Sequence, residues 1–430
     1  MDLPDVIEWL TSRDLLTGPF GLHRMEYLME RLDHPQRQYP AVLIGGTNGK
    51  GSVTVLLESI MAATDIYQVG STISPHLVDL TERIRLQTGP MPAKHWIAGA
   101  TALQDIVSVM DRESSLGPPS FFELVTALAF FAFREADLDL AVVEVGLGGR
   151  LDATNVCHPE VSIITNIGTD HRELLGPDRP SIAREKLGIL RPKRPLITAE
   201  RDPEILAIFR EVCQKARSPL IEAHPQNFFD VIESTAHGHR LRLRGVDGDV
   251  HLPLPGLHQL DNLALVLAAV QVLSDHGFEI PPAAIARGIS RVSWPGRLQW
   301  LPGNPPILVD GAHNAEGLAS LTGFLDRFPL ERPCHLILGS LQKKPGPAMA
   351  AALAPYADTL AFVPPTSSRA LTRSEFDAQI APLDVRWKWY PTLPEALEAG
   401  QNARTILLSG SLYLVADLLR LKGLPGGSRA

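Results

Sequence analysis

The chain has 430 residues, of which 45% are hydrophobic and 20% are charged, and its formal net charge is −8. This size predicts a globular protein of two or three domains, and the acidic balance without a strongly basic stretch argues against nucleic acid as a partner. The three cysteines, Cys157, Cys213 and Cys334, lack metal-ligand spacing, which fits a reducing cytoplasm and no disulfide framework. Because the N-terminus lacks a signal-peptide pattern and no apolar run approaches the ~20 residues that span a bilayer, we expect a cytoplasmic protein without a membrane partner.

A glycine-rich turn lies near the start of the chain. Residues 3–33 predict two helices with a break at Gly18-Pro19. Then Ala41–Ile44 predicts a short buried strand and Val53–Met61 a helix. The turn between them reads Gly45-Gly46-Thr47-Asn48-Gly49-Lys50-Gly51-Ser52. A turn of this kind cradles phosphate, because its backbone N–H groups point inward and the helix dipole adds positive potential.

Lys50 and Ser52 make this turn a candidate nucleotide site. In a phosphate-binding loop the lysine reaches the terminal phosphates and the hydroxyl meets a phosphate or Mg²⁺. The match to the usual pattern is incomplete, because Ile44 replaces its first glycine and Gly51 separates the lysine from the serine. An ordinary glycine-rich turn is the alternative, and the placement of both polar residues after a strand makes it the weaker interpretation.

Two later strands end in side chains suited to metal binding. Leu138–Gly146 predicts a buried parallel strand with Glu144 near its end, and Val161–Ile167 predicts another, followed by His171. Ligands of open α/β sheets bind beyond such strand ends, and carboxylate oxygen suits Mg²⁺. A solvated acid and a structural histidine are the alternatives. Further along, Lys186 is expected to be an exposed helix lysine.

Two other segments flank the predicted core. Tyr67–Thr72 predicts a strand, and Ser74 lies in the loop that follows. Ser120 and Glu123 have the spacing of a capping box before an apolar helix, Leu124–Phe133, which is a sufficient structural reason for both residues.

The pattern changes after residue 226. Alternation in His239–Arg244 and Val250–Leu254 around a turn at Val246–Asp249 predicts a β-hairpin beside the parallel core. Asn262 opens a strongly apolar helix, Leu263–Leu273, where its side chain can serve as a cap.

The chain divides near Ser293–Arg297, where Pro295-Gly296 marks a break and the hydrophobic period restarts. Helices are predicted from Asn314 and at the C-terminus, and the predicted strands are Ile307–Asp310, His335–Gly339, Thr359–Val363, Val385–Tyr390 and Thr405–Leu408. Such alternation implies a mostly parallel sheet. We therefore expect an α/β protein with a P-loop-type, mostly parallel sheet domain over residues 1–294 and a smaller Rossmann-like α/β domain over residues 297–430.

The loop Gly46–Ser52 resembles that of the Mur-ligase superfamily, in particular the folylpolyglutamate synthase and dihydrofolate synthase family. Five further motifs occur in the family's order: Ser74-Pro75-His76-Leu77 with Glu82-Arg83-Ile84, Ser120-Phe121-Phe122-Glu123, Gly146–Asn155, Asp170-His171 and Arg184-Glu185-Lys186. The resemblance runs from Gly45 to Asp310 and is weaker beyond. It departs at Leu341–Pro345, where relatives commonly carry Asp-Lys-Asp, and at His23, where they often carry Glu.

The resemblance implies ATP-dependent ligation of L-glutamate to dihydropteroate and to reduced folates through an acyl phosphate. It also implies ATP, two Mg²⁺ ions, room for a monovalent cation, and a monomer. Three alternatives stay open: a monofunctional folylpolyglutamate synthase, a Mur-type ligase acting on a UDP-linked precursor, and a nucleotide-binding switch without ligation.

The resemblance further implies residue roles. The residues expected to contact ATP are Asn48, Gly49, Lys50, Gly51, Ser52, Asn262, Arg297 and Asp310. Those expected to contact Mg²⁺ are Ser74, Glu144 and His171. Those expected to contact pteroate or folate are Ser120, Phe121, Phe122, Glu123, Leu151, Asp152 and Ala153. Lys50, His171 and Lys186 would be the catalytic residues, with the Lys186 amine carbamylated into a carboxylate that faces metal.

Overall fold

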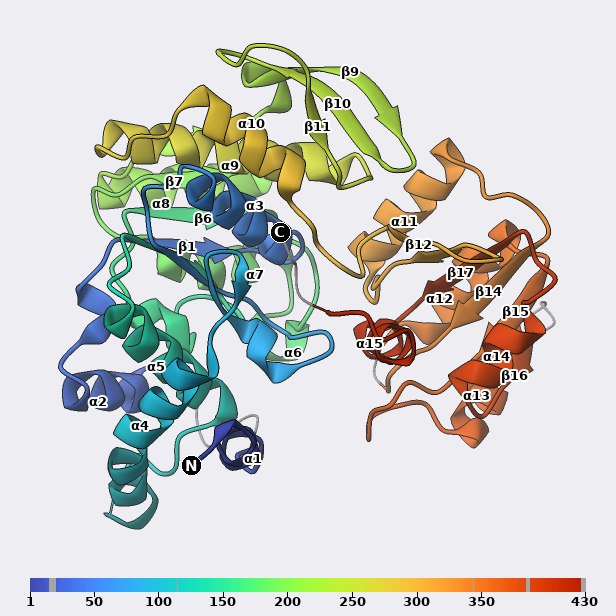
Figure 1. Cartoon of the computed structure of the whole chain (residues 1–430), viewed down its shortest axis with the longest axis horizontal. Coiled ribbons are helices and arrows are strands. Elements are labelled where there is room, and N and C mark those ends of the chain that lie inside the picture. Colours follow the sequence, from blue (N-terminus) through green and yellow to red (C-terminus); the bar gives the residue numbers. More distant parts are fainter. Residues whose placement is uncertain (15–20, 114, 343, 384–386, 427–430) are drawn as a thin grey trace.

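The computed structural model describes residues 1–14, 21–113, 115–342, 344–383 and 387–426, and within them the chain forms two α/β units that lie side by side (Figure 1). The larger unit contains an eight-stranded sheet and a small three-stranded sheet, and the second unit contains a six-stranded sheet. Among the described helices, none is both long and apolar enough to cross a membrane. All three cysteines are buried and free.

The larger unit has these helices and strands in chain order: α1 (Leu3–Thr11), α2 (His23–Arg31), β1 (Ala41–Gly45), α3 (Lys50–Ala62), β2 (Val69–Thr72), β3 (Ile84–Leu86), β4 (Gly89–Pro90), α4 (Ala93–Glu113), α5 (Phe121–Glu135), β5 (Leu140–Glu144), β6 (Val161–Ile164), α6 (Arg172–Leu175), α7 (Arg179–Lys186), β7 (Leu196–Thr198), α8 (Pro203–Ala216), β8 (Leu220–Glu222), β9 (Phe229–Thr235), β10 (Gly238–Leu243), β11 (Val250–Leu252), α9 (His258–Asp275) and α10 (Pro282–Arg291).

The eight-stranded sheet places β1 at its centre. Its order is β4-β3-β2-β5-β1-β6-β7-β8, and β1 runs parallel to both β5 and β6. These three strands are buried at every residue, because a hydrophobic cluster covers each face of the sheet. One cluster includes residues of α1, α2, α4 and α5. The cluster on the opposite face includes residues of α3, α9, α10 and the small sheet. The loops that leave β1, β5 and β6 therefore meet at one edge, where ligands of such sheets bind.

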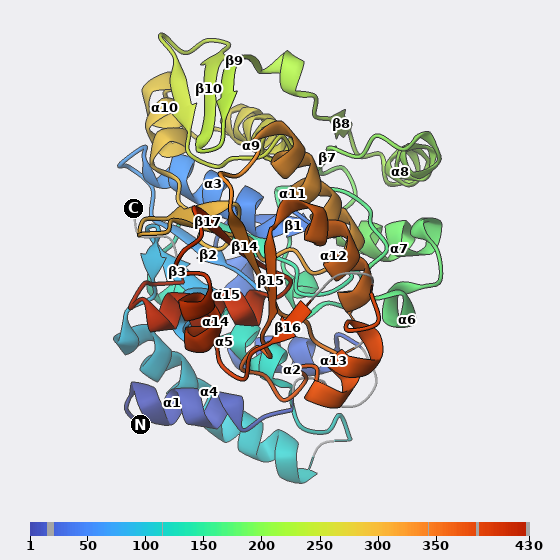
Figure 2. The ribbon, with the colours of Figure 1, turned by 90° about the vertical axis from the view of Figure 1, so that its right-hand side faces the viewer.

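The second unit has these helices and strands: β12 (Gln299–Leu301), β13 (Ile307–Val309), α11 (Ala315–Arg327), β14 (Cys334–Leu338), α12 (Gly346–Leu353), β15 (Thr359–Phe362), α13 (Arg373–Gln379), β16 (Trp387–Trp389), α14 (Leu393–Ala399), β17 (Thr405–Ser409) and α15 (Leu412–Leu421). The sheet order is β12-β13-β17-β14-β15-β16, parallel except for β12. In Figure 2 this unit lies in front of the larger one.

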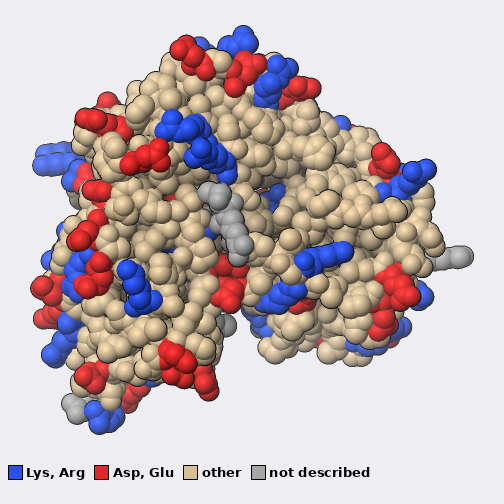
Figure 3. Space-filling view, viewed as in Figure 1, with Lys and Arg blue, Asp and Glu red and all other residues tan. Residues whose placement is uncertain are grey.

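The two units touch through α15, which faces the larger unit (Figure 1). Leu77 and Val78, from the loop after β2, pack against the apolar cluster that includes α15. The guanidinium of Arg420 also donates to the carbonyl oxygen of Val78 over 3.0 Å. On the face seen in Figure 3, lysine and arginine are interspersed with aspartate and glutamate.

Most predicted elements are present within a few residues of their expected bounds, including the hairpin β10–β11. Sequence patterns missed the short strands β3, β4, β7, β8 and β12 and the third strand of the small sheet, β9. Asn262 was expected at a helix start, but it lies inside α9, whose N-cap position is Leu257. The predicted break at Gly18-Pro19 and the first two residues of the predicted strand Val385–Tyr390 lie outside the described residues.

Candidate active site

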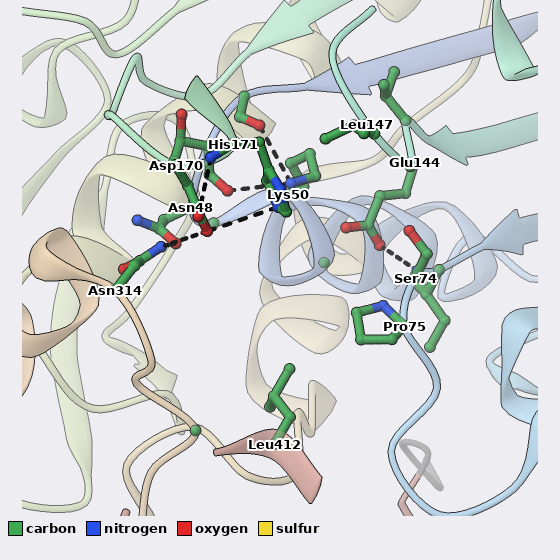
Figure 4. A pocket seen from close by; sticks show the side chains of 18 of the residues that line it. Asn48, Lys50, Ser74, Pro75, Glu144, Leu147, Asp170, His171, Asn314 and Leu412 are labelled. Atoms are coloured by element: carbon green, nitrogen blue, oxygen red, sulfur yellow. Dashed lines mark hydrogen bonds and ion pairs between the residues drawn. The ribbon is translucent and has the colours of Figure 1, made fainter. Parts of the chain in front are cut away.

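A cavity of about 570 Å³ opens between the two units, and loops from both line it (Figure 4). The larger unit contributes the loops that leave β1, β2, β5 and β6. The second unit contributes the loop after β13 and the start of α15, where Leu412 points toward the cavity. This volume lies within the range of about 300–1,000 Å³ that is typical of small-molecule sites.

The turn after β1 is shaped as a phosphate loop. Gly46 and Gly49 have φ of 134° and 87°, and a side chain at Gly46 would overlap that of Thr165. The helix α3 begins at Lys50, earlier than the sequence predicts. The Lys50 amine donates to the carbonyl oxygens of Gly46 and Thr47 over 3.2 and 3.1 Å, so it lies over the loop where a phosphate would meet it.

The departure from the usual phosphate-loop pattern has a packing reason. A Cβ on Gly51 would lie 2.6 Å from Cζ2 of Trp294, so only glycine lets this indole pack on the start of α3.

A Cβ on Gly49 would lie 2.5 Å from Oδ1 of Asn262, whose Nδ2 donates to Gln259 over 2.9 Å. Asn262 therefore supports the loop from α9.

Glu144 and Ser74 form a pair of oxygen donors beside the loop. Glu144 is 4% exposed, and one of its carboxylate oxygens accepts the backbone N–H of Ser74 over 2.9 Å (Figure 4). Burial raises the pKa of Glu144 to about 7, against the opposing effects of Lys50 and the Ser74 N–H group. A buried carboxylate next to a serine hydroxyl is a hard-oxygen donor set, which fits Mg²⁺.

His171 lies on the other side of Lys50 from Glu144, because β6 and β5 flank β1 (Figure 4). Its side chain is 44% exposed, and burial lowers its pKa although Asp170, whose Oδ2 is 3.8 Å from His171 Nε2, opposes this. Lys344 of the second unit is 3.2 Å from Asp170. Within the described chain, no group of three or more histidine, cysteine, aspartate or glutamate side chains is arranged to hold a metal. A metal at either position would therefore draw further ligands from phosphate or water.

Lys186 is buried, whereas the sequence predicted an exposed lysine on a helix. It is the last residue of α7 and is 4% exposed, because this end of the helix packs beneath the phosphate loop. Its amine donates to the carbonyl oxygen of Gly46 over 2.8 Å. Burial, and then the nearby charge of Lys50, lowers the pKa of Lys186 to about 7.

The predicted capping box is present at the start of α5. The backbone N–H of Glu123 donates to the hydroxyl of Ser120 over 3.3 Å, and that of Ser120 donates to the Glu123 carboxylate over 2.8 Å. Arg24 pairs with both carboxylate oxygens of Glu123 at 3.0 Å. Ser120, Glu123 and Arg24 line the cavity, whereas Phe121 is buried beneath the guanidinium of Arg83, 5.1 Å from its ring.

An apolar wall faces this end of the cavity. Phe122 packs so closely on Gly146 that a side chain there would overlap its ring. Leu151, Asp152 and Ala153 also line the cavity. Asp152 is buried, which raises its pKa, and it accepts the backbone N–H groups of Leu147 and Thr154. These hydrogen bonds to the Asp152 side chain support the turn after β5.

Arg297 and Asp310 bring the second unit to the cavity. Asp310 accepts the backbone N–H groups of Leu298 and Ala312 over 2.9 and 2.8 Å. Burial raises the pKa of Asp310, and the charge of Arg297 opposes that rise. His313 follows on the same loop, and burial lowers its pKa to about 4, so its imidazole is neutral.

Comparisons with known proteins agree with this architecture. Residues 44–270 match the Mur ligase middle domain, and residues 296–412 match the Mur ligase glutamate ligase domain. The chain is 31% identical over 426 residues to the dihydrofolate synthase/folylpolyglutamate synthase of Bacillus subtilis, covering 96% of this chain and 97% of that protein. It is 33% identical over 427 residues to the protein of the same name from Escherichia coli, covering 96% and 94%. The chain belongs to this Mur-ligase family.

Solved structures of family members share the fold. Folylpolyglutamate synthase from Mycobacterium tuberculosis, complexed with ADP and AMPPCP, matches with a TM-score of 0.85 at 31% identity, covering 98% of both chains. The apo form of the Lacticaseibacillus casei enzyme matches with a TM-score of 0.84 at 27% identity, covering 98% of this chain and 100% of that one. The present family member is thus an ATP-dependent amino-acid ligase with two α/β units.

Within this family member, the cavity gathers all the predicted site residues except Asn262 and Phe121, which lie directly behind it. The sequence interpretation missed several polar side chains that also line the cavity: Arg24, Arg83, His258 and His313. Arg83 lies inside a quoted motif, and Arg24, His258 and His313 each lie within about four residues of a position named from the sequence, so proximity to these positions was the available signal. Asp170, adjacent to His171, was quoted without a role.

Proposed function

We propose that this protein joins L-glutamate to the carboxyl group of dihydropteroate and of reduced folates, with ATP as the energy source. The observation that carries the proposal is one cavity that combines a phosphate loop, a buried oxygen-donor pair and an apolar wall. Relatives named for both activities support both acceptors. Complexes of relatives with ADP and AMPPCP, and one with AMPPCP and folate, support the nucleotide and folate assignments.

The proposed reaction has two steps. A carboxylate oxygen of the acceptor attacks the γ-phosphorus of ATP, and the bond to the bridging oxygen breaks to leave ADP and an acyl phosphate. The amine of L-glutamate then attacks the acyl carbon, phosphate leaves, and the nitrogen loses its proton. Lys50 at the phosphate loop would stabilise the charge that develops on the phosphoryl oxygens.

The residues present fit Mg²⁺ on one side of the phosphate loop in particular. The Glu144 carboxylate is buried, and a cation would compensate the cost that raises its pKa. Ser74 and Glu144 would hold one ion, and His171 would face a second. Mg²⁺, when bound, would polarise the transferred phosphoryl group.

We further infer that Lys186 is carbamylated in the active protein. A buried amine with a pKa of about 7 is neutral in a large fraction of molecules at neutral pH. The neutral amine attacks CO₂ and releases a proton, which gives a carbamate with one negative charge. This change would convert a cation next to Lys50 into an anion able to face a metal.

We assign the two predicted domains separate tasks. Residues 1–294 would bind the phosphates, metal and acceptor, and residues 297–430 would bring Arg297 and Asp310 to ATP and receive L-glutamate. Because the cavity lies between them, closure would exclude the water that hydrolyses an acyl phosphate.

The proposal is tested with purified protein, ATP and L-glutamate plus one acceptor at a time. We expect ADP release that requires L-glutamate together with dihydropteroate or a reduced folate. Turnover with reduced folates alone would reduce the assignment to a monofunctional enzyme. Turnover of a UDP-linked precursor, or ATP hydrolysis at a rate that does not depend on L-glutamate, would contradict the proposed function.

A further inference from the structure

The loop that carries His171 is held from two sides. On one side, the backbone N–H of Gly168 donates to the hydroxyl of Thr47 in the phosphate loop over 2.8 Å. On the other side, the backbone N–H and the hydroxyl of Thr169 donate to Oε1 of Glu316 over 2.9 and 3.2 Å. Glu316 belongs to the first turn of α11, so the second unit holds this loop two residues before His171.

The fit at Gly168 shows how close this contact is. A Cβ on Gly168 would lie 2.6 Å from Oε1 of Glu316 and 2.8 Å from Cγ2 of Thr47. Real Cβ atoms do not approach other atoms so closely, so glycine is what lets the loop pass between the two side chains. The φ of Gly168 lies outside the left-handed region, so an alanine would be opposed by these two side chains, which would have to move, and not by the backbone.

Glu316 differs from the other residues that join the units at this point. Asn314 donates to Asn48 over 3.2 Å, and Lys344 pairs with Asp170; of these four residues, Asn48, Asp170 and Asn314 line the cavity. Glu316 is not one of the cavity-lining residues of the described chain; it lies behind the loop. A ligand in the cavity can therefore contact Asn314 directly, whereas Glu316 contacts the loop at the backbone N–H and the hydroxyl of Thr169.

The carboxylate of Glu316 is only partly satisfied where it lies. Its second carboxylate oxygen, Oε2, is buried without a hydrogen-bond partner among the described residues. A buried acceptor left unpaired lowers stability, so folding alone gives no reason for a carboxylate at this position. What the carboxylate does provide at this position is the pair of hydrogen bonds that it accepts from Thr169.

We propose that Glu316 is a positioning residue: by binding the backbone of Thr169 it holds His171 beside the phosphate loop when the two units are docked. This inference rests on the proposed metal role of His171. Residues that orient a metal ligand from behind typically change metal affinity about 10- to 100-fold when they are removed. Glu316 would act in this way from the second unit, which couples docking of the units to the metal site.

The test compares Glu316→Ala and Glu316→Gln, with Glu331→Ala as a control at an exposed position on the same unit. Mn²⁺ binding is measured by electron paramagnetic resonance in the presence of AMPPCP, and hydrogen exchange is measured over residues 165–175. We expect Glu316→Ala to weaken Mn²⁺ binding about 10- to 100-fold and to speed exchange at Thr169. The amide oxygen of Glu316→Gln still accepts the Thr169 N–H, so this variant should recover most of both properties.

Gly168→Ala gives a second arm, because its methyl group would displace the Glu316 carboxylate without removing it, although it would also crowd Thr47 of the phosphate loop; it should reproduce the Glu316→Ala result. Wild-type exchange and Mn²⁺ binding in both alanine variants would overturn the proposal, as would equal losses in Glu316→Ala and Glu316→Gln. A His171→Ala arm separates the two claims. If that variant keeps wild-type Mn²⁺ binding, the metal role of His171 fails, and the exchange result alone decides whether Glu316 holds the loop.

Discussion

The amines of Lys186 and Lys50 both donate to the carbonyl oxygen of Gly46, at 2.8 and 3.2 Å. Burial, and then the proximity of Lys50, lowers the pKa of Lys186 to about 7. The phosphate loop therefore has two lysines with different chemistry: Lys50 lies over the loop, where a phosphate would meet it, and Lys186 lies beneath it with an amine that readily becomes neutral.

Replacing Lys186 should remove activity and change how stability depends on pH. The folded-state pKa lies below the ordinary value of 10.5, so between pH 7 and 10.5 the unfolded chain binds more protons than the folded one. In CO₂-free buffer, wild-type stability should therefore rise across this window relative to Lys186→Met. Urea unfolding at pH 7 and pH 9.5 measures the difference.

Activity provides the second readout for Lys186. Lys186→Ala should be inactive, and formate or acetate should restore part of the rate by replacing the missing carboxylate. The exposed Lys215→Ala is the matched control and should behave as the wild type. Full activity of Lys186→Ala would rule out carbamylation as a requirement.

Glu144→Gln should separate metal binding from folding. Burial raises the pKa of Glu144 from 4.5 to about 7, so the folded protein binds more protons between those values and its stability falls as pH rises through them. The glutamine variant lacks this fall and should be more stable at pH 8 without metal, by up to about 3 kcal/mol. Mg²⁺ with AMPPCP should raise the melting temperature of the wild type far more than that of Glu144→Gln. Equal shifts in both proteins would remove Glu144 from the metal site.

Lys50→Ala should lose ligation while it keeps its fold. Loss of a preorganised charge at the transferred phosphoryl group typically lowers kcat by at least about 100- to 1,000-fold. Loss of its two bonds to the loop should cost only about 1 kcal/mol of unfolding free energy. Steady-state rates and thermal melts check both statements, with the exposed Lys94→Ala as control. Substantial remaining activity would count against the phosphate-loop assignment.

Ser120 and Thr372 begin equivalent capping boxes in the two units, at α5 and α13. Each alanine variant should lose about 1 kcal/mol, because each loses the same cap. Only Ser120→Ala should raise the KM for the folate or pteroate acceptor, since Ser120 also lines the cavity. An unchanged acceptor KM would leave Ser120 with its capping role alone.

Local patterns were enough to predict the centre of the larger unit. A buried strand, a glycine-rich turn and a helix follow each other in sequence, so β1, the phosphate loop and α3 are visible as one run. Glu144 was predictable for the same reason, because alternation of elements places strand ends at one edge. The capping box at Ser120 needs only a spacing of three residues.

Features that depend on packing between distant segments could not be predicted in this way. Lys186 ends a short helix whose own sequence is polar, and only its packing beneath the phosphate loop makes it buried. Trp294 contacts Gly51 from a distant part of the chain, and Glu316 contacts Thr169 across the interface between the units. The strands β3 and β4, at one end of the large sheet, have only three and two residues, too few for a periodic signal.

The central claim is that ATP activates the acceptor carboxylate by transfer of its γ-phosphoryl group. The most direct measurement uses an acceptor whose carboxylate oxygens are ¹⁸O, with ATP and L-glutamate, under single-turnover conditions, followed by mass spectrometry of the products. The account predicts ADP, and phosphate that carries one labelled oxygen from the acceptor. Release of AMP, or phosphate without label, would contradict it.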